Sequence, residues 1–259
     1  GGEKIKKFLI FITKMIYVSL STIPSRINTI NKSIDSLMNQ SLKPDKIFLN
    51  VPTYFKRFKE TILDKDIPKL PDIVEITRCD DCGPGTKLLG SINKLKENSL
   101  IVLADDDQIY EDYMLETFYK FYQKNPNNAY SFYVHPLGKF GIGQGADGFA
   151  INTNSLENIN IFYDKIVKNN FELFLYDDLW ISFFLFFIKK NKILSLHNFL
   201  KEDEMGKKKT IYVSHNDKSG LISTYAENLI DAVKERDKKA FVSFKYMLDE
   251  MQKLNLNSF

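Results

Sequence analysis

Cysteine is nearly absent from this sequence, and the two that occur, Cys79 and Cys82, are separated by only two residues. A structural zinc site needs four ligands, and the sequence has no second C-x-x-C pair to supply them. The two residues between the thiols are aspartates, whose charge raises thiol pKa values and argues against a reactive redox pair. We therefore expect free thiols and a reducing, cytoplasmic location, with a loop disulfide as the second interpretation.

A strong charge excess and a long apolar run are also missing. The formal net charge is only +3, so the chain has no extended basic surface for nucleic acid, and its short lysine clusters are expected to be solvated. The apolar residues 8–12 and 15–20 are interrupted by Lys14 and are too short for an integral membrane span. Peripheral attachment to a membrane stays open.

Core-forming residues, in contrast, are abundant. Hydrophobic residues make up 44% of the 259 residues, including 21 Phe and 13 Tyr. This is enough apolar material for one large domain with a helical appendage. We expect the domain at residues 15–220 and a C-terminal helical extension at residues 221–259.

Periodicity predicts an α/β fold in which a mostly parallel central sheet is flanked by helices. Short apolar segments predict strands at residues 15–20, 46–51, 74–78, 100–103, 129–134, 193–196 and 211–213. Apolar residues at helical spacing predict helices at residues 27–40, 55–63, 87–95, 113–124, 176–190, 222–235 and 238–254.

One strand runs directly into three consecutive acids, at Asp105, Asp106 and Asp107. The preceding apolar run predicts a strand buried on both faces, and ligands bind at the carboxyl ends of such strands. In an extended segment Asp105 and Asp107 point to one side, where a Mg²⁺ or Mn²⁺ ion on a phosphate would relieve their repulsion. Asp106 would bind backbone or sugar hydroxyls. The alternative is an acidic turn in which Asp107 caps a helix beginning near Glu111.

A second pair of acids, Asp177 and Asp178, begins a helix whose residues 180–188 are apolar on all sides. Either acid could simply cap that helix. A deeply buried helix nevertheless places its first residues rigidly, as a general base requires. The neighbouring Trp180 and Tyr176 could stack on a sugar ring, and packing of Trp180 in the core is at least as good an account.

Glycine is sparse overall, but five of the 12 glycines fall between residues 138 and 148. Such a density predicts a loop whose backbone approaches a ligand closely, or simply a flexible loop. The spacing is not that of a dinucleotide-binding motif. A second loop, Gly83-Pro84-Gly85, precedes Lys87 in the first turn of a helix, where lysine and helix amides could face an anion. A plain surface role for Lys87 is an equal alternative.

Five segments, taken in order, resemble a known family. They are S-T-I-P-S-R at residues 21–26, G-P-G-T-K-L at 83–88, A-D-D-D at 104–107, the glycine-rich loop up to Gly148, and D-D-L-W-I-S at 177–182. Their order and spacing resemble glycosyltransferases of the GT-A fold, and most closely a family-2-like branch found in bacteria and large viruses. The resemblance covers most of residues 15–220, and the fold that it implies is a Rossmann-like sheet binding a nucleotide-sugar.

The resemblance implies roles for individual residues. The D-x-D motif that holds a divalent metal on the diphosphate falls on Asp105 and Asp107. The acidic pair of the family falls on Asp177, where relatives usually have Glu, and on Asp178, which matches the acceptor's general base. A late metal-binding histidine and a diphosphate-binding lysine fall on His215 and Lys218, at an uncommon spacing. The remaining donor-site residues are Thr22, Pro24, Arg26, Asp80, Lys87 and Asp106, with Asp81 near the nucleoside.

The implied activity is metal-dependent transfer of a hexose from a nucleotide-sugar, a UDP-sugar, to a hydroxyl of a glycan or protein. The cofactor would be Mn²⁺ or Mg²⁺, and inversion is preferred although retaining enzymes share the D-x-D. A sugar-nucleotide pyrophosphorylase would need a glycine-rich basic loop where this chain has S-T-I-P-S-R. A haloacid-dehalogenase-type phosphatase would carry its D-x-D on the first strand. The rival from another class is a non-catalytic binding or assembly module of the same fold.

The C-terminal extension carries apolar residues at helical spacing, at Leu229, Ile230, Val233, Phe241, Phe244, Met247, Leu248 and Met251. Helices with this pattern bury one face. We expect that face to pack on the catalytic domain, with a homodimer through the C-terminal helices as the alternative.

Overall fold

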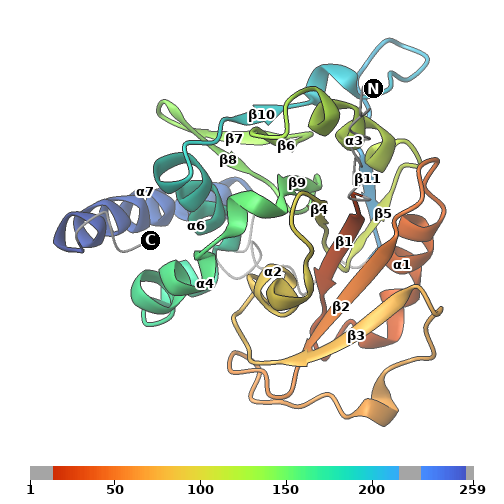
Figure 1. The fold of residues 1–259 in the computed structure, drawn as a ribbon, viewed down its shortest axis with the longest axis horizontal. Coiled ribbons are helices and arrows are strands. Elements are labelled where there is room, and N and C mark those ends of the chain that lie inside the picture. The colour runs from red at the N-terminus through yellow and green to blue at the C-terminus, as the bar shows by residue number, and fades with distance from the viewer. Residues whose placement is uncertain (1–13, 216–228, 255–259) are drawn as a thin grey trace, which may run out of the picture.

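The computed structural model describes residues 14–215 and 229–254, and a seven-stranded sheet lies at its centre (Figure 1). The spatial order of its strands is β3-β2-β1-β4-β9-β6-β10. The strands are β1 (Ile16–Ser21), β2 (Lys46–Pro52), β3 (Val74–Cys79), β4 (Leu100–Leu103), β6 (Ala129–Ser131), β9 (Phe149–Asn152) and β10 (Ile193–Ser195). Of the strands in this sheet, β9 alone runs antiparallel to its neighbours. The sheet is therefore mostly parallel, which confirms the predicted fold class.

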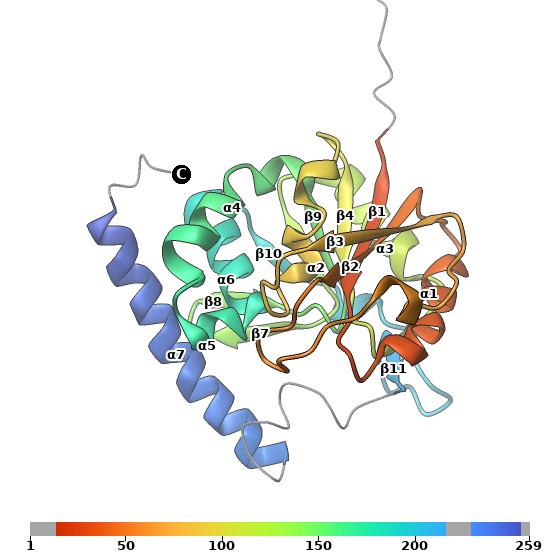
Figure 2. The same cartoon turned by 90° about the horizontal axis from the view of Figure 1, so that it is seen from below.

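Helices cover both faces of the sheet. They are α1 (Ile30–Met38), α2 (Thr86–Leu89), α3 (Met114–Lys124), α4 (Ile159–Phe162), α5 (Phe171–Phe174), α6 (Asp177–Phe183) and α7 (Leu229–Lys253). Successive side chains of a strand face opposite sides, so Ile16, Val18 and Leu20 of β1 pack with α1 and α3. Tyr17, between them, belongs to the opposite cluster with α4, α6 and α7. Figure 2 shows these two groups of helices on either side of the sheet.

Two small sheets flank the central one. Strand β5 (Gln108–Tyr110) pairs with β11 (Tyr212–Ser214), and β7 (Val134–Leu137) pairs with β8 (Phe140–Gly143), both antiparallel. The acid triplet is thus followed by a strand, so Asp107 does not cap a helix near Glu111. The glycine-rich segment is partly the β7–β8 hairpin, and only its end is a loop. The expected single strand at residues 129–134 is two strands, β6 and β7.

Two predicted helices are wrong or shorter than expected. Residues 55–63 form a turn closed by an antiparallel bridge between Phe55 and Glu60, with Lys59 at a positive φ of 54°. The helix predicted at residues 87–95 ends at Leu89, and a short 3-10 helix follows at Ile92–Lys94. Gly90 lies between them, and a Cβ there would come within 2.7 Å of Asn50. Close packing of this loop on β2 therefore outweighs the local helical periodicity.

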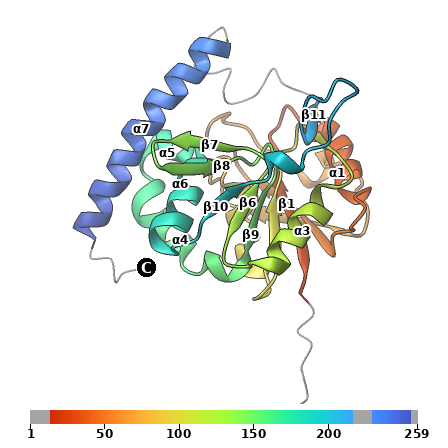
Figure 3. The same cartoon turned by 90° about the horizontal axis from the view of Figure 1, so that it is seen from above.

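Residues 229–253 form one continuous helix, α7, across the break predicted between helices 222–235 and 238–254, and residues 222–228 of the first predicted helix lie outside the described residues. No glycine or proline interrupts residues 229–253, so the backbone has no reason to break near residue 236. Its apolar face packs on the rest of the domain: Phe244 lies against Phe140, Phe183 and Phe187, with ring centroids 5.4 to 5.7 Å apart. Figure 3 shows α7 running beside α5, α6 and the β7–β8 hairpin. The intramolecular packing that we favoured is the one observed.

Across residues 14–215 and 229–254, no helix has the length and apolar character needed to cross a membrane.

Truncation of one buried residue on α7 tests how firmly this helix is docked. Met247 is fully buried, whereas Val242 is 62% exposed on the same helix. We expect Met247→Ala to lower the free energy of unfolding by about 2–5 kcal/mol, because it opens a cavity in the core. Val242→Ala, the matched control, should cost well under ~1 kcal/mol. Urea unfolding measures both. Equal effects for the two variants would show that α7 does not pack as described.

Candidate functional site

The topology brings four separate segments to one edge of the sheet. Because β1, β3 and β4 are parallel, the chain leaves each of them at the same edge, in segments 21–26, 80–87 and 105–107. Strand β9 is antiparallel and so begins at that edge, which brings in the loop at residues 144–148. The start of α6 supplies the remaining side. Together they line a cleft of about 240 Å³.

Of the predicted site residues, eight line this cleft: Thr22, Arg26, Lys87, Asp105, Asp106, Asp107, Asp177 and Asp178. The other four predicted residues are placed differently, as described below.

Asp106 is the most firmly held acid of the triplet. Thr22 Oγ1 donates a hydrogen bond of 2.7 Å to its Oδ2, and Arg26 Nη1 lies 2.7 Å from its Oδ1. Ser33 Oγ donates to its backbone oxygen at 2.7 Å. Burial raises the pKa of Asp106, and the charge of Arg26 opposes that shift. The Asp106 carboxylate is therefore a structural anchor between β4 and the loop after β1, and its oxygens bind protein groups.

Asp107 and Asp105 carry the less compensated charge. Arg26 Nη2 lies 3.0 Å from Asp107 Oδ2, yet burial and then the charge of Asp105 raise the pKa of Asp107 to about 7. Asp105 pairs with Lys87 Nζ, and its backbone N–H donates to Tyr110 Oη at 2.8 Å. Burial and the neighbouring Asp105 thus both disfavour the charged form of Asp107, and a bound cation would favour it.

Lys87 lies between the two sets of acids. Its Nζ contacts Asp105 and lies 3.3 Å from Asp177 Oδ2, an ion pair whose geometry does not form a hydrogen bond. The side chain is 7% exposed. Burial alone would lower the lysine pKa, but the charges of Asp105, Asp177 and Asp178 outweigh it and hold the pKa well above its ordinary value. The surface interpretation of Lys87 is therefore wrong.

The backbone beneath Lys87 is fixed by a buried polar network. Its carbonyl accepts hydrogen bonds from Ser19 Oγ at 2.5 Å and from Asn50 Nδ2 at 3.2 Å, and Asn50 Nδ2 also donates to Ser19 Oγ at 2.9 Å. Ser19 and Asn50 come from β1 and β2, so the sheet itself sets the position of the lysine. These hydrogen bonds between buried groups restrict where the Lys87 backbone can lie.

The two acids of α6 have distinct environments. Asp177 is buried and faces Lys87, whereas Asp178 is partly exposed in the cleft. Gly145 N donates to Asp178 Oδ1 at 2.9 Å. Burial, and then the neighbouring charge of Asp177, raises the pKa of Asp178 well above its usual range. Asp178 is therefore held at one oxygen by the Gly145 amide, in surroundings that disfavour its charged form.

The loop at residues 144–148 contributes residues that sequence reasoning did not single out. A Cβ on Gly145 would come 2.9 Å from Lys87 Nζ and 3.3 Å from both Asp105 and Asp178, so a side chain there would displace the Lys87 ammonium. Burial, and then repulsion from Asp105, raises the pKa of Asp147 to about 7. The glycine density indicated a close approach of the backbone, but only the antiparallel β9 shows where that approach occurs.

Four predicted site residues are not among those that line the cleft. Asp80 lines a second pocket with Cys82 and Tyr163, and Pro24 lines neither pocket, although Asp81 lines both. His215 lies behind the triplet. Its ring atom Nε2 is 2.9 Å from Ser33 Oγ, and its backbone N–H donates to the backbone oxygen of Asp107. Lys218 lies outside the described residues.

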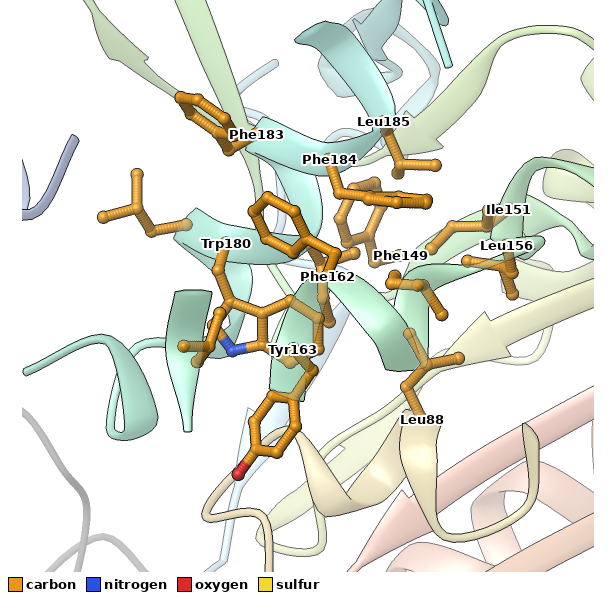
Figure 4. Close-up of a cluster of buried hydrophobic side chains, with 14 of the residues drawn as sticks. Leu88, Phe149, Ile151, Leu156, Phe162, Tyr163, Trp180, Phe183, Phe184 and Leu185 are labelled. Atoms are coloured by element: carbon orange, nitrogen blue, oxygen red, sulfur yellow. The ribbon is translucent and has the colours of Figure 1, made fainter. Parts of the chain in front are cut away.

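Trp180 belongs to the core. It is fully buried beside Tyr163, with ring centroids 5.5 Å apart (Figure 4), and a Cβ on Gly85 would come within 2.6 Å of its ring. It cannot stack on a sugar, so the packing interpretation holds. Tyr176 does line the cleft. Cys79 and Cys82 are free thiols, and burial raises the pKa of both, to about 12 for Cys79.

A divalent ion fits the donor set of this cleft. Within the described residues no three His, Cys, Asp or Glu side chains are grouped to hold a metal. Mg²⁺ and Mn²⁺ in nucleotide sites, however, take only one or two carboxylates and complete their shell with phosphate oxygens and water. Asp105 and Asp107 supply two carboxylates, and a bound cation would favour the charged form of Asp107, which burial and then the charge of Asp105 disfavour.

No protein-family model and no curated protein matches this sequence. Among solved structures, the mannosyltransferase PcManGT from Pyrobaculum calidifontis, in complex with GDP-Man and Mn²⁺, is 12% identical with a TM-score of 0.51. The match covers 92% of this chain and 74% of that one. TarS 1–349 from S. aureus, in complex with UDP-GlcNAc, is 11% identical with a TM-score of 0.52, over 94% and 74% of the two chains.

A 2-C-methyl-D-erythritol 4-phosphate cytidylyltransferase from Francisella tularensis is also similar, at 12% identity and a TM-score of 0.49, over 86% of this chain and 99% of that one. The two glycosyltransferases place the fold in the Rossmann-like GT-A class. At these identities the likeness concerns the fold alone.

The pH dependence of stability tests the position of Asp147. An unfolded aspartate titrates near ~4, whereas the folded pKa is about 7. As pH rises between these values the unfolded chain releases a proton that the folded chain keeps, so stability is lost. Asp147→Asn removes this loss. From pH 4.5 to pH 8 the free energy of unfolding of the variant should therefore rise by about 1–2 kcal/mol relative to that of the parent. Urea unfolding at both values measures it.

Asp72→Asn, at an exposed position before β3, is the matched control and should show no such gain. If the free energies of unfolding of the parent and of Asp147→Asn differ by the same amount at both pH values, the Asp147 carboxyl lies in solvent.

Proposed function

We propose that this chain is a metal-dependent glycosyltransferase that moves a hexose from a UDP-sugar to a hydroxyl of a glycan or protein, with inversion. One observation carries the proposal: the acid triplet after β4 and the acid pair of α6 meet in one cleft, on either side of Lys87. A leaving-group site and a base site are thereby adjacent. The fold shared with a GDP-Man-bound mannosyltransferase and a UDP-GlcNAc-bound TarS supports the same class.

The donor would occupy the side of the cleft built from β1 and β4. Asp105 and Asp107 would hold Mn²⁺ or Mg²⁺ on the diphosphate, and the bound ion supplies stabilisation of the leaving group's negative charge. Arg26 and Lys87 lie at the same carboxylates and would add positive charge close to the phosphates. Thr22 donates to Asp106, and Asp106 pairs with Arg26, so the Arg26 guanidinium would already be in position when the donor binds.

The acceptor would approach Asp178. In the proposed step the acceptor hydroxyl gives its proton to the Asp178 carboxylate while its oxygen forms a bond to C1 of the sugar. The bond between C1 and the diphosphate oxygen breaks, and the nucleoside diphosphate leaves with that electron pair. The Gly145 amide holds Asp178 Oδ1, which leaves Oδ2 to accept the proton. Asp177 is paired with Lys87 and would serve positioning.

Calorimetry with UDP and Mn²⁺, followed by a donor-hydrolysis assay, tests the proposal as a whole. We expect metal-dependent UDP binding and slow release of UDP from a UDP-sugar. Binding without turnover on any donor or acceptor would favour a non-catalytic module. Release of pyrophosphate from a nucleoside triphosphate and a sugar phosphate would identify a pyrophosphorylase instead.

The metal site is tested by Asp107→Asn. A neutral amide is a poorer ligand for a hard cation, so Mn²⁺-dependent UDP binding should be lost. The fold should survive, since Arg26 keeps its ion pair with Asp106 and Asp107 lies at a strand end. Calorimetry of UDP binding with and without Mn²⁺ measures the effect, with urea unfolding as the check on folding. Unchanged metal dependence would rule out the D-x-D assignment.

The base is tested by Asp178→Asn, which keeps size and hydrogen bonding but removes basicity. Donor and metal binding should persist, while the transfer rate should fall at least ~10²-fold. Because the pKa of Asp178 is raised, its carboxylate form increases with pH above the ordinary aspartate range. The parent's rate should therefore rise with pH, and the residual rate of the variant should lack that rise.

Asp177→Asn is the matched comparison for the base and should be milder, since Asp177 would act through positioning. Transfer rate and UDP affinity are measured for both variants side by side. Near-parental transfer by Asp178→Asn would move the base elsewhere and favour a retaining mechanism.

A further inference from the structure

Helix α7 contributes a residue to the cleft. Arg236 lines it together with Phe174, Leu175 and Tyr176 of the segment that joins α5 to α6. The sequence placed residue 236 in an appendage outside the catalytic domain. Figures 2 and 3 show that α7 passes beside α5 and α6, which brings part of this helix to the cleft.

Two polar side-chain contacts hold this part of α7 in place, of which the one made by Lys239 is an ion pair. Lys239 Nζ lies 3.2 Å from Glu172 Oε1 on α5, and Asp237 Oδ1 lies 3.1 Å from His135 Nε2 on β7. Further along the helix, Met247 is fully buried in the core. Arg236 is therefore presented by a helix that contacts two neighbouring elements close to it.

The guanidinium of Arg236 is itself oriented. Its Nε and Nη2 donate to Asp237 Oδ1 at 3.2 and 3.0 Å, and its side chain is 18% exposed. Its Nη1 makes no hydrogen bond with any residue in the described part of the chain. An arginine keeps five N–H donors and its charge at every pH in proteins. Beside apolar Phe174 and Leu175, its attraction for an anion is stronger than in open water.

Arg236 lies on the α5–α6 side of the cleft. The same segment continues from Tyr176 directly into Asp177 and Asp178, whereas Thr22, Arg26 and Asp106 come from β1 and β4 on the sheet side. A molecule whose hydroxyl reaches Asp178 would extend past Phe174 and Tyr176 toward Arg236. A donor diphosphate held at the triplet would not need this arginine.

We propose that the acceptor carries an anionic group, a phosphate or a carboxylate, and that Arg236 binds this group and selects the acceptor. The proposal rests on the function proposed above, because it takes the Asp178 side as the acceptor side. A planar guanidinium matches both anions through paired N–H donors, which is the reason for arginine at such positions. The part of α7 that carries Arg236 is then a specificity element of the site.

The test is calorimetry on the full chain saturated with UDP and Mn²⁺, so that the diphosphate site is filled. The probes are glucose 6-phosphate, glucuronate and neutral glucose. We expect at least one anionic probe to bind roughly tenfold or more tightly than glucose, since a hydrogen bond to a charged group contributes that much. Arg236→Gln should remove the preference. Lys234→Gln, an exposed α7 position, should keep it. The two anionic probes separate phosphate from carboxylate.

Equal binding of charged and neutral probes, or a preference that survives Arg236→Gln, would overturn the inference. UDP binding and donor hydrolysis are measured for the parent and for Lys234→Gln alongside, which separates the two proposals. Donor hydrolysis without any preference for anionic probes would support the proposed function and rule out the role of Arg236. Anion binding that depends on Arg236, in a chain that hydrolyses no donor, would support the anion site and rule out the proposed function.

Discussion

The contact on which the site depends is the buried ammonium of Lys87 between Asp105 and Asp177. These acids come from distant parts of the chain, and without a cation between them their charges would drive the end of β4 and the start of α6 apart. Burial disfavours a charged lysine, yet its pKa is raised, so the surrounding acids more than offset the loss of water. The lysine therefore fixes the relative position of the two acidic elements.

Lys87 can do this only because its backbone is held independently. Ser19 and Asn50 bind its carbonyl from β1 and β2, so the first two strands determine where its side chain begins. From the other side, Gly85 packs on the ring of Trp180, where a Cβ would come within 2.6 Å. Trp180 and Asp177 lie on the same helix, α6. The contact between Gly85 and Trp180 thus sets how closely the segment that carries Lys87 approaches α6. Packing in the hydrophobic core therefore helps to position the charged groups of the site.

Sequence reasoning found the parts of the site whose signals are local. The apolar run before the triplet, the acids opening an apolar helix, and the glycines near residue 145 each stand out within a few residues. The missed features depend on long-range contacts. Strand β9 has four residues and is recognised only by its pairing with β4 and β6, and Asp147 gains its raised pKa only when that strand brings it to Asp105. The turn at residues 55–63 is likewise closed by one bridge, from Phe55 to Glu60.

The positive charges in the lining of the cleft include Arg26 and Lys87 from near the beginning of the chain and Arg236 from near its end. The acids at the centre of the cleft already occupy Arg26 and Lys87, which hold the site together. An anion at these cations would therefore share them with the carboxylates. Arg236 lies outside the acidic cluster, because its ion pair is with Asp237 on its own helix. A helix late in the sequence thus brings a separate positive charge to the lining of the cleft, and the anion site that we propose would use that charge.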